Sequence, residues 1–144
     1  MLRKRTIGAI GASALALGAT LTLATPASAA TAGMTCSAEG YYSTGNVNYT
    51  NSGTQHRIST YDWVIHGESG STQNNVDVIL YRDVSISPDP ELNSFSTANA
   101  KNGYGSHGVN LSYPTSYNLY GWFNFIFDVN NGGDPRCDDE TTRF

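Results

Sequence analysis

The sequence predicts an all-β protein: a single antiparallel β-sandwich, immunoglobulin-like or jelly-roll-like, with about six to eight strands. After residue 29 no segment shows an apolar period of 3.6 residues over a helical length. Runs of β-branched and aromatic residues instead alternate with turn-forming Asn, Ser and Gly. Two cysteines, Cys36 and Cys137, lie near the two ends of this region. Together these features predict a sandwich clasped by one disulfide bond.

The beginning of the chain is typical of an exported protein. Three basic residues within the first five precede an uncharged stretch over 6–25 and an A-x-A site that ends at Ala29. We therefore expect residues 1–29 to be a secretory signal peptide and 30–144 to be one secreted domain. An uncleaved anchor helix is the alternative, because the stretch is nearly long enough to cross a bilayer. Secretion also favours the Cys36–Cys137 disulfide.

Three strands are expected in the first half of this domain. The first covers residues 40–51 and the second covers 57–66, where aromatic and β-branched residues alternate with polar ones. The third covers 76–81 and is expected to continue through 84–86 past a bulge. Pro88-Asp89-Pro90 then ends it, because proline cannot donate a hydrogen bond to a β-ladder.

The second half contains the clearest strand. Apolar residues are scattered over 91–113, which predicts a long connection with one or two short strands. In 117–129 the odd positions include Phe123, Phe125 and Phe127. Because successive strand residues point to opposite faces, the odd set is expected in the core and the even set on the outside. The outward residues proposed for binding are Tyr120, Trp122, Asn124 and Ile126.

The charge of the domain excludes several partners. Residues 30–144 contain five basic and twelve acidic side chains, which gives a net charge of −7. Nucleic-acid binding requires clustered Lys and Arg, and none cluster here. The same argument excludes a polybasic contact with anionic lipid. No second apolar span follows the leader, so no membrane span is expected after cleavage.

No catalytic residue is predicted. In Gly103–Gly108, Ser106 stands beside His107, but a nucleophile elbow requires glycine where Tyr104 lies. An ordinary glycine-rich loop is the simpler interpretation. The histidines are too widely spaced for a local zinc signature: His56, His66 and His107. A small secreted hydrolase or toxin, with its site assembled by the fold, remains a further alternative.

One acidic segment partly matches a calcium loop. Asp128, Asn130 and Asp134 supply oxygens at positions one, three and seven, and Asp139 falls at position twelve. However, position five is Gly132, and no flanking helices are expected. A polar turn followed by solvated acids explains the segment more simply. No cofactor is therefore expected, with calcium as the alternative.

The outward residues of 117–129 carry the functional hypothesis. Tyr and Trp are common at protein interfaces because they combine apolar area with a polar group. We expect an acidic, bacterial, non-enzymatic interaction module that binds another protein. It would be an adaptor or small subunit of an exported complex, such as a secreted toxin particle, or a hydrolase inhibitor that inserts Pro88–Pro90 or Gly103–Gly108. The alternative is a carbohydrate-binding module that stacks sugars on Trp122, Tyr120 and Trp63.

Overall fold

The computed structural model describes residues 28–144, in which every regular element is a β-strand. Residues 1–27, which hold nearly all of the expected signal peptide, lie outside this range. No helix within 28–144 is long and apolar enough to cross a membrane. The strands are β1 (Ser28–Ala38), β2 (Tyr41–Ser52), β3 (Gln55–His66), β4 (Asn74–Asp83), β5 (Glu91–Ala100), β6 (Gly103–Pro114), β7 (Asn118–Ile126) and β8 (Arg136–Glu140).

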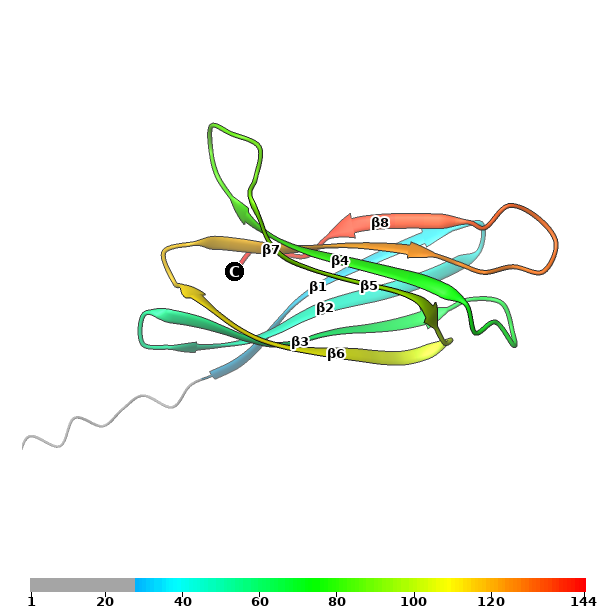
Figure 1. The fold of residues 1–144 in the computed structure, drawn as a ribbon, viewed down its shortest axis with the longest axis horizontal. Coiled ribbons are helices and arrows are strands. Elements are labelled where there is room, and N and C mark those ends of the chain that lie inside the picture. The colour runs from blue at the N-terminus through cyan, green and yellow to red at the C-terminus, as the bar shows by residue number, and fades with distance from the viewer. Residues whose placement is uncertain (1–27) are drawn as a thin grey trace, which may run out of the picture.

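The strands form two antiparallel four-stranded sheets that pack face to face (Figure 1). One sheet has the order β1-β2-β3-β6 and the other the order β5-β4-β7-β8. The predicted all-β sandwich is therefore confirmed, with eight strands in the described range.

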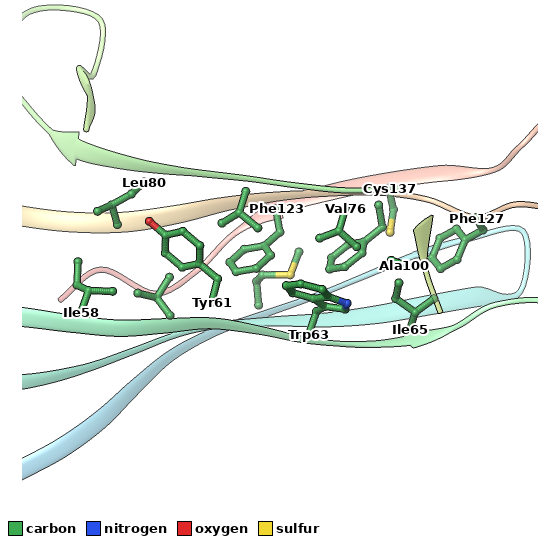
Figure 2. Close-up of a cluster of buried hydrophobic side chains, with 14 of the residues drawn as sticks. Ile58, Tyr61, Trp63, Ile65, Val76, Leu80, Ala100, Phe123, Phe127 and Cys137 are labelled. Carbon is green, nitrogen blue, oxygen red and sulfur yellow. The ribbon is translucent and has the colours of Figure 1, made fainter. Parts of the chain in front are cut away.

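The core lies between the two sheets. The strand expected over 117–129 supplies Phe123, Phe125 and Phe127, which are fully buried, so its alternation is confirmed. From the opposite sheet, Trp63 and Tyr61 of β3 pack against them (Figure 2). Removing so much aromatic surface from water is the main stabilising contribution to the sandwich.

The expected long connection over 91–113 is wrong, because it forms the two long strands β5 and β6. Both are edge strands, whose inward residues are only partly covered and need not be uniformly large and apolar. For the same reason Gly103–Gly108 is part of a strand and not a loop. The alternation of apolar and polar residues is weak there, because small residues such as Gly105 occupy inward positions. Gly105 lies against the indole of Trp63.

Three further boundaries differ from the sequence prediction. Val84–Ile86 does not continue the third strand, because residues 84–90 form the loop between β4 and β5. Strand β1 was not expected, since most of its residues are small and it lacks the large β-branched and aromatic residues that mark the other strands. Strand β8 lies within the acidic segment that was interpreted as a solvated tail. Its pairing with β7 supplies the hydrogen bonds that its own residue types do not predict.

The disulfide closes one side of the sandwich. Cys36 of β1 is bonded to Cys137 of β8, and their Cα atoms are 5.7 Å apart, which confirms the predicted pairing. The amide of Thr142 also donates to the carbonyl of Gly33, joining the same two edges. On the other side the edge strands β5 and β6 have no further strand partner within residues 28–144.

Candidate functional site

The outward face of the β5-β4-β7-β8 sheet carries the four residues proposed for binding. On this face Trp122 of β7 lies between Ile79 of β4 and Glu140 of β8. The next pair of positions places Asn124 between Asp77 and Asp138. The even-numbered residues of β7 therefore face outward, as the alternation predicts.

Tyr120 faces outward but is covered by its neighbours, and only 6% of it is exposed. Its ring stacks on Tyr81, and the guanidinium of Arg143 lies 4.4 Å from the ring centre. Its hydroxyl donates a 2.8 Å hydrogen bond to Oδ2 of Asp89. Burial and, second, this hydrogen bond raise the pKa of Tyr120 well above its ordinary value. Tyr120 is therefore a covered residue of this face and contributes little exposed surface to it.

Asn124 is buried for a similar reason, with 3% exposed. Its amide nitrogen donates to Asp77 at 2.8 Å, and its amide oxygen accepts from Arg136 at 3.2 Å. Ser96 donates to the other oxygen of Asp77. The chain of hydrogen bonds crosses all four strands of the sheet, so it fixes their side chains in one arrangement.

Trp122 keeps part of its indole exposed. It lines a shallow, open hollow of about 340 Å³ together with Ile79 and two outward serines of β5. The indole N–H donates to Asp138 at 3.3 Å, which fixes the orientation of the ring. Ile126 is half-buried on the same face, where it is paired with Asn75 and Arg136. The hollow beside Trp122 is the apolar centre of this surface.

Carboxylates surround this centre. Strand positions on the same face carry four acids, and Arg143 forms 3.0 Å ion pairs with two of them, Asp83 and Glu140. These partners raise the pKa of Arg143, the hydrogen bond to Asp83 contributing most. Asp77 and Asp138 accept only neutral hydrogen bonds from their neighbours. The rim of the hollow is therefore acidic.

The loop over residues 84–90 rises beside this surface. Figure 1 shows it standing away from the sandwich beyond the ends of β4 and β5. Asp89 braces it, because Oδ1 accepts the backbone N–H of Val84 at 2.9 Å and Oδ2 accepts the hydroxyl of Tyr120. The bond from Val84, followed by that from Tyr120, holds the pKa of Asp89 below its ordinary value.

Ile86 in this loop is 98% exposed, the highest fraction among the large hydrophobic residues of the described chain. Sequence reasoning missed it, because the residue was assigned to a strand. A usable signal was present: an isoleucine between two serines, directly before Pro88-Asp89-Pro90, is an apolar residue in turn-forming surroundings.

The residues considered for catalysis do not converge. Ser106 points outward and donates to Asp62, whereas His107 points inward and stacks on Phe95 at 3.9 Å. His56 contacts Asn51, and His66 stacks on a tyrosine of β2. Among residues 28–144 no three His, Cys, Asp or Glu side chains lie close enough to hold a metal ion.

The three residues proposed as calcium ligands form hydrogen bonds with other groups of the protein. Asp128 accepts from Ser71, Asn130 donates to Glu68, and Asp134 accepts the amide of Val129. Asp128 and Asp134 direct oxygens to two different protein donors, and Asn130 uses its amide nitrogen, so these contacts do not form the converging oxygen set of a calcium loop. The polar-turn interpretation accounts for these contacts.

No protein-family model, curated protein or solved structure matches this chain.

Proposed function

We propose that the protein is a secreted, non-enzymatic module that binds another protein. Its docking face consists of the Trp122 hollow, the acidic residues around it and the 84–90 loop. The observation that carries this proposal is Ile86, an almost fully exposed apolar side chain on a loop that Asp89 braces against the sheet. An exposed apolar side chain on a loop held in this way can insert into a pocket of a partner protein.

The composition of the docking face supports a protein partner. Protein interfaces combine an apolar, often aromatic centre with a polar rim, and Trp is enriched among the residues that dominate binding. A braced loop loses little conformational entropy on binding. The complementary partner has an apolar pocket for Ile86, and, because Asp77 and Asp138 flank the Trp122 hollow, it has basic groups opposite that hollow. An adaptor, a subunit of an exported complex and a hydrolase inhibitor all satisfy this description.

The burial of Tyr120 and Asn124 favours this proposal over carbohydrate binding. Stacking along a glycan requires several well-exposed rings, and on this face Tyr120 is buried while Trp122 and Tyr81 are each only partly exposed. Trp63 is buried in the core and offers none. Secretion is supported by the Cys36–Cys137 disulfide, since such bonds persist in oxidising compartments.

The test begins with capture of binding proteins from the culture medium of the producing organism and measurement of the dissociation constant for a purified partner. Trp122→Ala is expected to weaken binding by roughly 30-fold, as loss of an interface tryptophan commonly does. Ile86→Ser is expected to weaken it similarly, with the melting temperature preserved. Tyr42→Ala is the control, because Tyr42 is exposed on the opposite sheet.

Two results would overturn the proposal. The first is wild-type affinity in both Trp122→Ala and Ile86→Ser. The second is binding to insoluble polysaccharide with no protein partner, which would support the carbohydrate-binding module instead.

A further inference from the structure

Among residues 28–144, the side of the sandwich opposite the disulfide has two edges without a further strand partner. Strands β5 and β6 each end their sheet, and β6 presents a twelve-residue edge. Exposed edges are normally protected by charged residues or by prolines within the strand, because their unpaired N–H and C=O groups attract other strands. The segment Gly103–Pro114 contains no charged residue, and its single proline is the last residue. This edge is unprotected along most of its length.

A bulge divides β6 into two parts. The pairing with β3 shifts between Ile58 and Thr60, and Asn110 adopts a positive φ of 54° at that point. Bulges bend an edge and interrupt its capacity to pair. The regular part is therefore Gly103–Gly108, which pairs in unbroken antiparallel register with β3.

We propose that a second copy of this chain adds to this edge by antiparallel pairing of β6 with β6, in a two-fold register centred on Ser106. In this register Tyr104 of one copy lies opposite Gly108 of the second copy. His107 likewise lies opposite Gly105 of the second copy. The two β1-β2-β3-β6 sheets then form one continuous eight-stranded sheet.

The sequence of the edge selects this register. Strand residues alternate faces, so only a centre on a residue keeps the outward faces of both copies on the same side. A centre on Gly105 places Gly105 opposite itself, and a centre on His107 places His107 opposite itself. The centre on Ser106 gives the exposed ring of Tyr104 a glycine to cover, an arrangement that stabilises glycine at sheet edges.

The exposure of the edge residues agrees with this pairing. Tyr104 is 70% exposed, so most of its surface is open to solvent in the described part of the single chain. A Cβ at Gly108 would meet no atom within 4 Å, so the position facing that ring in the second copy is open. Pairing would cover both, and it would bring together strands that carry no charge to repel one another.

The pairing is tested with the full-length secreted protein by sedimentation over a range of concentrations, which is expected to show a monomer–dimer equilibrium. Ser106→Cys is expected to form a disulfide-linked dimer in air, because residues directly opposite across a ladder lie within disulfide reach, about 5 Å. Ser112→Cys is the matched control. The two Ser112 residues would be about 40 Å apart in the dimer, so it should not cross-link.

Ser106→Lys provides the second test, since it places two positive charges opposite each other at the two-fold axis. It is expected to raise the dimer dissociation constant by about tenfold or more. A monomer at every concentration, equal cross-linking by Ser112→Cys, or unchanged association of Ser106→Lys would each overturn the proposal. None of these results bears on the docking face around Trp122, which lies on the other sheet.

Discussion

The ring of Phe123 lies directly over Gly45, where β7 passes across β2. A Cβ at position 45 would lie 2.6 Å from the nearest ring carbons of Phe123, well inside van der Waals contact. The opposite sheet shows the same relationship, because a Cβ at Gly121 would lie 2.7 Å from Val47. Two glycines therefore set how closely the sheets approach, and they let large residues occupy the space between them.

Gly45→Ala is consequently expected to destabilise the protein by about 1–3 kcal/mol, because overpacking a filled core displaces side chains or backbone. Chemical denaturation measures the change. Gly133→Ala is the matched control, since a Cβ there meets no atom within 4 Å. Equal free energies of unfolding for the two variants would mean that the two sheets can move slightly apart without a loss of stability.

Cys36 and Cys137 are expected to give no titratable thiol in denaturant without reductant. Their sequence separation is 101 residues, and the chain-entropy model assigns a loop of that size about 4.7 kcal/mol of stabilisation. Reduction should therefore lower the melting temperature by many degrees. Detection of two free thiols in the unreduced protein would contradict the pairing.

Asn124→Ala is expected to destabilise the protein by about 1–3 kcal/mol, because Asn124 is only 3% exposed and the substitution removes both the hydrogen bond that it donates to Asp77 and the one that it accepts from Arg136. From the strand alternation alone this substitution should be nearly silent. Ser94→Ala, an exposed position on the same face, is the control. The free energies of unfolding of both variants, measured by chemical denaturation, show whether the hydrogen bonds of Asn124 stabilise the fold or whether Asn124 behaves as a solvated surface residue.

Trp63→Ala should cost about 3–5 kcal/mol, as truncation of a buried aromatic residue usually does. Trp122→Ala should cost clearly less, because part of the indole already contacts water. Thermal melting of the pair checks this difference. Comparable losses would place Trp122 in the structural core and remove it from the docking face.

The brace of the 84–90 loop is expected to depend on pH. The folded pKa of Asp89 lies below its ordinary value of 3.8, so its contribution is present above that pH and is lost as the pH falls through the folded pKa. The protection of the Val84 amide against hydrogen exchange, relative to its intrinsic rate at each pH and followed by NMR, should fall in that acidic range. Asp89→Asn should show faster exchange already at neutral pH, whereas Asp134→Asn, in a different turn, should leave it unchanged.

The sequence by itself determined the fold class, the disulfide and the inward face of β7. These depend on local signals: a two-residue period of large apolar residues, and two cysteines in a chain whose beginning predicts a signal peptide. The same period correctly assigned Tyr120, Trp122, Asn124 and Ile126 to the outward face. Alternation fixes the direction of a side chain, because the geometry of an extended strand leaves little choice.

Only the tertiary structure decided which of those outward residues are covered. Tyr120 is covered by Asp89, which lies 31 residues away, and Asn124 is covered by Asp77, which lies 47 residues away. Strand β8 and the edge strands β5 and β6 likewise form because neighbouring strands supply their hydrogen bonds. The exposure of Ile86 follows from how far the braced loop stands from the sheet. Contacts over such separations depend on which strands the whole chain brings together, and no local pattern of residues specifies them.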